Sequence, residues 1–156
     1  PAANGYRLPT EAEWAWAARA TSGDAKRFGW GQQFPPADGA GNFADSSASR
    51  MVDQVLTGYN DGFAVSAPVG SFSPNHRGLY DLEGNVAEWA NDYYGIEFSL
   101  GTGAEKDPTG PASGEFRVIR GASWRHGNII QLRLSYRDYG LDGRDDLGFR
   151  VARNVE

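Results

Sequence analysis

GLYDLEGNVAEW, residues 78–89, is the stretch that decides the fold of this 156-residue chain, because it places acids around a tight turn. Asp81 and Glu88 stand on either side of the dipeptide Gly84-Asn85. Asparagine tolerates tight backbone conformations and hydrogen-bonds locally, so we expect Asn85 to shape the turn. The two carboxylates indicate a cation site, and the chain contains no cysteine that could supply thiol chemistry.

Four other phrases accompany this stretch, and they are YRLPTEAEWAWAARA (6–20), GFAVSAPVGSF (62–72), RVIRGASW (117–124) and LGFRVAR (147–153). Together the five phrases closely resemble the formylglycine-generating enzyme family, also called the sulfatase-modifying factor domain, in the same order and across essentially the whole chain. The resemblance implies an irregular, loop-rich α+β fold of the C-type-lectin type, with a small antiparallel sheet and few short helices. It also implies calcium sites and, in the founding enzymes, a copper-dependent oxidation of a substrate cysteine.

The length fits a single domain, residues 1–156, that can bury one core. Relatives carry a further segment before the RLPTEAEW phrase, so we expect this chain to lack the N-terminal segment of the domain. Family analogy favours an extracytoplasmic location, periplasmic or secreted. The absence of cysteine agrees with either an oxidising or a reducing compartment.

Charge and composition exclude two classes of partner. The formal net charge of -5 argues against a nucleic-acid binder, which normally presents a basic face to phosphate. No run of 18 or more apolar residues occurs, so we expect no membrane span in this chain. The 21 glycines and 8 prolines indicate that turns carry much of the architecture.

A helix is expected at residues 10–20. Thr10 followed by Glu13 forms a capping box, and the alanine-rich run after it favours helix. Trp14, Ala17 and Ala18 lie at helical spacing, which indicates a face turned to the core.

The middle of the chain has few periodic signals. Residues 23–74 are dense in Gly, Pro, Asn, Asp and Ser and predict long loops. Residues 84–92 are expected to form a second short helix. Residues 97–114 are expected to form a surface loop.

Alternation of apolar and polar residues predicts strands at 131–137 and 149–151, and residues 117–124 predict a third. We expect the three strands to form an antiparallel sheet. The connecting loops 125–130 and 138–146 would then lie exposed at its ends.

The resemblance assigns two calcium sites, and calcium takes six to eight oxygen ligands, carbonyls included. The first site would use the side chains of Asn42 and Asp61 and the carbonyls of Phe43 and Phe63. The second would use the side chains of Asp81 and Glu88 and the carbonyls of Gly84 and Val86.

The residues alone leave a plainer interpretation open. Asp61 precedes a glycine, and Asp-Gly is a common turn signal. Asp81 and Glu88 would then cap a short helix and bind no ion.

The copper centre of the oxidase members is not expected here. Their two cysteines follow the phrase that matches RGAS, whereas this chain has His126 near the first cysteine position and no thiol near the second. A thiolate pair is what selects soft Cu(I), so we expect no copper and no formylglycine formation. Three roles are possible for His126: an exposed loop residue, a contact for an unknown ligand, or a metal ligand. A serine nucleophile has no support, because Ser123 lacks a G-x-S-x-G context.

A binding surface is expected where the loops after Ser123 and Arg137 meet. Its residues would be Trp124, Arg125, His126, Asn128, Arg137, Tyr139, Asp142 and Arg144. Tryptophan, tyrosine and arginine are enriched among interface anchors. The alternative is a solvated charged face with internal ion pairs, each contributing little to stability.

These observations predict a non-catalytic, calcium-stabilised module that recognises a protein, peptide or small polar ligand, within a larger polypeptide or assembly. The alternative is the substrate-binding part of a metal-dependent oxidase or of a sulfoxide synthase of the ergothioneine type.

Overall fold

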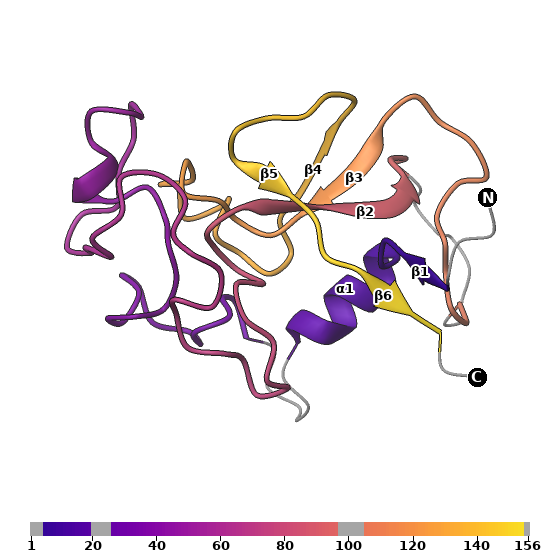
Figure 1. Cartoon of the computed structure of the whole chain (residues 1–156), viewed down its shortest axis with the longest axis horizontal. Coiled ribbons are helices and arrows are strands. Elements are labelled where there is room, and N and C mark those ends of the chain that lie inside the picture. Colours follow the sequence, from indigo (N-terminus) through magenta and orange to yellow (C-terminus); the bar gives the residue numbers. More distant parts are fainter. Residues whose placement is uncertain (1–4, 20–25, 97–104, 155–156) are drawn as a thin grey trace.

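The computed structural model describes residues 5–19, 26–96 and 105–154, and these residues form an α+β domain dominated by loops (Figure 1). Its elements in chain order are β1 (Tyr6–Arg7), α1 (Glu11–Ala18), the 3-10 helix η1 (Ser46–Ala48), β2 (Ala87–Tyr93), β3 (Arg117–Arg120), β4 (Arg137–Gly140), β5 (Leu147–Gly148) and β6 (Ala152–Arg153). No helix in these ranges is both long and apolar enough to cross a membrane.

Helix α1 begins where the capping box predicted. The Thr10 hydroxyl accepts the backbone N–H of Glu13 at 3.1 Å, and the Glu13 carboxylate accepts the backbone N–H of Thr10 at 2.8 Å. Such a cap stabilises a helix by about 0.5–2 kcal/mol. Trp14 and Ala18 are buried against Leu82, as the spacing predicted.

The larger sheet has the strand order β4-β3-β2-β5. The β3–β4 pair is antiparallel, as expected, and β2 adds an unexpected antiparallel partner to β3. Strands β2 and β5 run parallel, so the sheet is mixed. A second sheet pairs β1 with β6 antiparallel, beside α1 (Figure 1).

The short helix expected at 84–92 is wrong, because residues 87–93 form strand β2. This strand has a neighbour on each side, β3 and β5. Ala87, Glu88 and Ala90 are all buried. A strand covered on both faces does not alternate between apolar and polar residues, so its pattern resembles that of a helix.

The last third of the chain differs from the expected strands in three places. Residues 117–120 form β3, and the chain then leaves the strand at Gly121, which has φ 81°. Residues 131–136 form turns, and the strand β4 starts only at Arg137. Residues 149–151 link β5 to β6, with Phe149 68% and Val151 58% exposed, so their alternation reflects no buried face.

The loops have a core of their own. Between residues 26 and 80 they lie to one side of the sheet, in purple and magenta in Figure 1. They pack with Ala122 and Leu132 of the last third of the chain in one buried cluster, whose other members are Phe28, Phe43, Leu56 and Tyr59. The long loops predicted at 23–74 are therefore packed around aromatic rings, with η1 as their helical turn, while residues 23–25 lie outside the described ranges. The expected surface loop is irregular at 105–114, and its residues 97–104 also lie outside those ranges.

Candidate functional site

The Gly84-Asn85 turn joins three distant loops. Asn85 has φ 69°, and its side-chain amide exchanges two hydrogen bonds with the backbone of Ala67, at 2.8 and 3.1 Å. Its backbone N–H donates to the Asn42 carbonyl at 2.8 Å, and its own carbonyl accepts from Trp124 at 2.9 Å. Gly84 has φ 149°, and a Cβ there would lie 3.0 Å from the Asn42 carbonyl oxygen, so the turn requires glycine. Asn85 thus shapes the turn, as its residue type predicted.

The first expected calcium site lies beside this turn. Asn42 is fully buried, and its Oδ1 accepts no hydrogen bond within the part of the chain that the structure describes. Asp61 accepts the backbone N–H of Phe43 at 2.9 Å and that of Phe63 at 2.8 Å. An unpartnered amide oxygen close to a carboxylate and backbone carbonyls is a donor set that fits calcium. The bond from the backbone N–H of Phe63 to Asp61 also forms an Asx turn, as the interpretation without calcium expects. The geometry therefore agrees both with a calcium site and with a simple Asp-Gly turn.

Asp45, which the sequence analysis did not single out, supports this site. It is fully buried, caps η1 through the backbone N–H of Ser47 at 2.7 Å, and also accepts the backbone N–H of Asp61. Burial raises the pKa of Asp61 to about 6, and the charge of Asp45 adds to the effect. The signal that could have found Asp45 is the Asp-Ser-Ser sequence typical of an N-cap.

The second expected calcium site fits only in part. Asp81 accepts the backbone N–H of Gly70 at 2.7 Å, and its buried Oδ1 has no partner among the residues described. Glu88, in contrast, accepts the indole N–H of Trp14 at 2.7 Å and two guanidinium N–H groups of Arg150 at 2.5 and 2.7 Å. A calcium ion on Glu88 would face the charge of Arg150. Helix capping by Asp81 and Glu88 is wrong, because β2 stands where that helix was expected.

Among residues 5–19, 26–96 and 105–154, no group of three or more His, Asp or Glu side chains is placed to hold a metal ion. The two expected calcium sites use one or two carboxylates each, together with amide and carbonyl oxygens, and so would not form such a group.

His126 is buried, and the interpretation as an exposed loop residue is wrong. Its side chain is packed edge-on against Tyr136, and only 7% of the residue is exposed. Its Nδ1 accepts the backbone N–H of Ser123 at 3.2 Å, and burial lowers the pKa of His126, which keeps the ring neutral. Trp124 is also buried, at 2% exposure. Both rings support the loop from within and do not reach its surface.

Ser123 takes part in a buried polar network that sequence spacing did not reveal. Its hydroxyl donates to Asp146 at 2.8 Å, and Asp146 also accepts from Arg144 at 3.0 Å. A serine nucleophile would donate to a histidine, whereas this hydroxyl donates directly to a carboxylate and His126 accepts from the backbone. Ser123 is fully buried, so the network has the geometry of a structural clasp.

Strand β4 divides the expected binding surface in two, because neighbouring residues of a strand point to opposite faces. Arg137 and Tyr139 lie on one face, where both contact the ring of Tyr94. Asp138 lies on the other face and pairs with Arg144 at 3.0 Å. The single cluster expected from the sequence therefore does not form.

The remaining residues of that surface are mostly engaged. Arg125 pairs with Asp145 at 2.5 Å, and Arg137 binds Glu11 of α1 at 2.8 Å. Asn128 is half-buried and accepts the backbone N–H of Ile130 at 2.9 Å, while Asp142 is exposed. The internal ion pairs expected of a charged face are present at Arg125 and Arg144.

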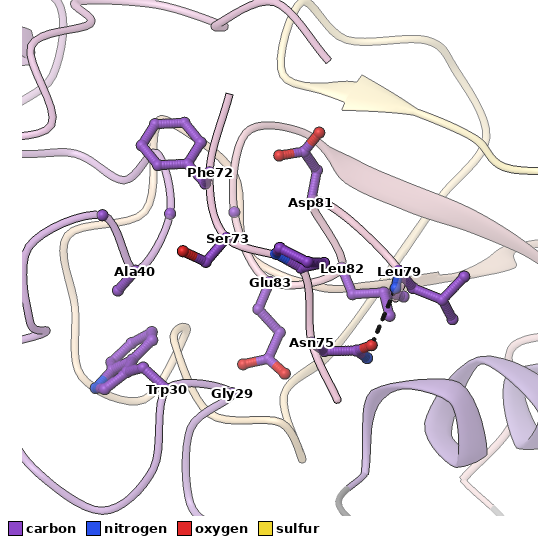
Figure 2. Close-up of a pocket in the computed structure, with 14 residues that line it drawn as sticks. Gly29, Trp30, Ala40, Phe72, Ser73, Asn75, Leu79, Asp81, Leu82 and Glu83 are labelled. Atoms are coloured by element: carbon purple, nitrogen blue, oxygen red, sulfur yellow. Dashed lines mark hydrogen bonds between the residues drawn. The ribbon is translucent and has the colours of Figure 1, made fainter. Parts of the chain in front are cut away.

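A cavity of about 140 Å³ opens beside the Gly84-Asn85 turn (Figure 2). Its polar feature is Glu83, whose Oε2 is buried without a hydrogen-bond partner among the described residues. The residue as a whole is only partly buried, but its carboxylate end points inward. Burial raises the pKa of Glu83 to about 8. No sequence signal marks this residue, because an acid next to a Gly-Asn turn normally faces solvent.

The fold and these sites define a class, the loop-rich α+β domain whose loops are held together by a Gly-Asn turn. The chain belongs to the family of the Sulfatase-modifying factor enzyme 1-like domain, whose model matches residues 2–155. The formylglycine-generating enzyme of Streptomyces coelicolor is 38% identical over 156 residues, covering 97% of this chain. The inactive C-alpha-formylglycine-generating enzyme 2 of Mus musculus is 36% identical over 163 residues, again covering 97%.

A solved structure supports the same assignment. PvdO from Pseudomonas aeruginosa superposes with a TM-score of 0.69 and 30% identity, covering 96% of this chain and 53% of that one. The chain spans less than half the length of these curated relatives, 48% of the Streptomyces enzyme and 44% of the mouse protein.

Proposed function

We propose that this chain is a non-catalytic, calcium-stabilised binding module of the sulfatase-modifying factor family, and that it works outside the cytoplasm. The observation that carries the proposal is His126, which stands near the first copper-binding cysteine position of the oxidases. It is buried and accepts a backbone N–H, in a chain with no cysteine. The name of the mouse relative, an inactive formylglycine-generating enzyme, supports the idea that the family includes members without that activity.

The proposal of calcium in the loops is supported by the unpartnered Oδ1 of Asn42 and by the carboxylate of Asp61, which binds the backbone of Phe43. A ligand that binds only the folded state stabilises it, by about 2.7 kcal/mol at a concentration of 100 Kd. Thermal unfolding in calcium and in a strong chelator therefore tests this part. A rise in Tm with calcium supports it, and identical melting curves contradict it.

The recognition surface is the charged face formed by Arg125 and Arg144, together with exposed Asp142. It covers the buried Ser123–Asp146 clasp, which holds Arg144 in place. The ligand is a protein, a peptide or a small polar molecule. Arg144 and Arg125 can exchange their carboxylate partners, Asp138 and Asp145, for acidic groups of the ligand.

The surface is tested by ligand capture with two arms. The double variant Arg125→Ala/Arg144→Ala should abolish capture, whereas Tyr139→Ala, on the opposite face of β4, should preserve it. Arg50→Ala, which removes an exposed arginine elsewhere, is the matched control for charge. Loss of capture in Tyr139→Ala but not in the double variant would move recognition to the other face.

The alternative is the substrate-binding part of a metal-dependent oxidase or sulfoxide synthase, favoured by the 38% identity to an enzyme. Elemental analysis of the purified full-length protein separates the two functions. Calcium without iron or copper supports the binding module. Stoichiometric iron or copper supports the oxidase.

A further inference from the structure

The cavity beside the Gly84-Asn85 turn is lined by none of the charged-face residues and by none of the ligands of the first calcium site, but Asp81 and Gly84, two expected ligands of the second calcium site, lie in its wall. It is lined by segments far apart in sequence, around residues 29–30, 39–41, 72–75 and 79–84. Figure 2 shows the Glu83 carboxylate pointing into the space between Gly29 and Asn75, with Trp30 on the side of Gly29. Asp81 also borders the cavity, but its carboxylate points to the opposite end.

One oxygen of the Glu83 carboxylate lacks a donor among the described residues, although the backbone N–H of Gly29 donates to the carboxylate. Its Oε2 is buried and accepts no hydrogen bond from any residue in the described ranges. The neighbouring amide of Asn75 is engaged elsewhere, because its Nδ2 donates to the Ala17 carbonyl at 2.8 Å and its Oδ1 accepts from Arg77 and Leu79. Buried polar atoms in proteins nearly always have partners, so the arrangement calls for a donor from a ligand.

The residues that line the cavity indicate which kind of ligand could donate to Glu83. A Cβ at Gly29 would lie 1.8 Å from Oε2, so the carboxylate lies directly against Gly29 and a side chain there would displace it. The indole N–H of Trp30 donates to the Gln33 carbonyl at 2.8 Å, which leaves ring carbons to line the cavity. Phe72, Leu79 and Leu82 add apolar surface. A carboxylate among aromatic and aliphatic groups matches an organic cation, whereas a divalent metal ion needs several further oxygens.

We propose that this cavity binds a primary ammonium group through Glu83, with the attached carbon chain against Trp30. A volume of about 140 Å³ is well below the roughly 300–1,000 Å³ of typical ligand pockets, so the bound part is a few heavy atoms. Two sources carry this chemistry, a free alkylamine and the lysine side chain of a peptide. The site adds a second binding position to the proposed module and does not depend on the charged face.

The test is an NMR titration of the whole chain, following the indole N–H resonance of Trp30. Butylammonium chloride should shift it saturably, while 1-butanol, of the same shape but uncharged, should not. Nα-acetyl-lysine methylamide is the second arm. Binding of both amines identifies a lysine side chain as a ligand, and binding of butylammonium alone identifies a free amine.

Substitutions at two cavity residues test whether the amine binds in this cavity. Glu83→Gln should weaken butylammonium binding at least tenfold, whereas Glu115→Gln, an exposed acid outside the cavity, should leave it unchanged. Ala40→Leu fills the cavity from its wall and should also block binding. A dispersed amide spectrum verifies that each variant is folded.

Three results would overturn the proposal. They are equal binding of butylammonium and butanol, unchanged binding in both cavity variants, and stoichiometric displacement of the amine by calcium or magnesium. The titration is run both in calcium and in chelator, so failure of the amine site is distinguishable from failure of the calcium sites.

Discussion

The indole N–H of Trp14 donates to the Glu88 carboxylate at 2.7 Å, in the buried space between α1 and β2. This bond joins the RLPTEAEW phrase to the GLYDLEGNVAEW phrase, 74 residues apart. Arg150, from the LGFRVAR phrase, binds the same carboxylate. Three of the five family phrases thus meet at Glu88. We infer that the main role of Glu88 is to hold these segments together.

Trp14→Phe should lower the free energy of unfolding by about 1–3 kcal/mol, because it leaves a buried carboxylate oxygen with one donor fewer. Urea unfolding measures the change. The matched control is Trp16→Phe, since Trp16 is on the same helix and 63% exposed. It should change stability by no more than about 0.5 kcal/mol. Equal effects of the two substitutions would contradict a role for the Trp14–Glu88 bond.

The two expected calcium sites should respond differently to mutation. Asp61→Asn should remove most of the difference in Tm between calcium and chelator, because it takes away the charge beside the unpartnered Asn42 oxygen. Glu88→Gln should keep at least half of that difference, because Arg150 already neutralises Glu88. For each variant, the Tm in calcium is compared with the Tm in chelator. This difference does not include the loss of stability that the substitution causes without calcium. If both variants lose the response equally, Glu88 contributes as much as Asp61.

Stability in chelator should fall as the pH rises from about 4 to 6. The pKa of Asp61 is raised from 3.8 to about 6 in the folded protein, so the folded state binds this proton more tightly than the unfolded state. The unfolded state therefore loses its proton first as the pH rises, and ionisation at Asp61 then costs the folded state stability. Glu83, with its pKa raised to about 8, extends the fall to higher pH.

Urea unfolding at pH 4, 5, 6 and 7 checks this slope. Asp61→Asn should flatten the part between pH 4 and 6, and saturating calcium should do the same in the unmodified chain, because the ion favours the ionised carboxylate. A slope that Asp61→Asn leaves unchanged would assign the effect to other groups.

Local signals predicted the parts of this fold that depend on neighbouring residues. The start of α1 follows from Thr10 and Glu13, and the tight turn follows from Asn85. The sequence of β2 predicted a helix, but this segment is a strand because it pairs with β3 and β5. Those strands lie about 30 and about 60 residues further along the chain, so no local signal reveals the pairing.

The candidate sites show the same division. The family resemblance named Asn42 and Asp61 as calcium ligands, and their binding of the ion stays a prediction. Burial of Trp124 and His126 depends on how the loop after Ser123 packs against Tyr136 and its neighbours. The Glu83 cavity requires Gly29 and Asn75 from two other loops. No spacing rule connects these residues, so only the three-dimensional arrangement reveals the cavity.

Ser123→Ala should destabilise the protein by about 1–3 kcal/mol, because Asp146 is buried and loses the hydroxyl donor. Ser66→Ala, at an exposed position, is the control and should change stability by at most about 0.5 kcal/mol. A fluorophosphonate probe, which labels activated serines, should not label the unmodified chain, since the Ser123 hydroxyl is inaccessible and donates to a carboxylate. Labelling that disappears in Ser123→Ala would instead reveal that Ser123 is a nucleophile. An unfolding curve unchanged by Ser123→Ala would show that the Ser123–Asp146 hydrogen bond does not stabilise the fold.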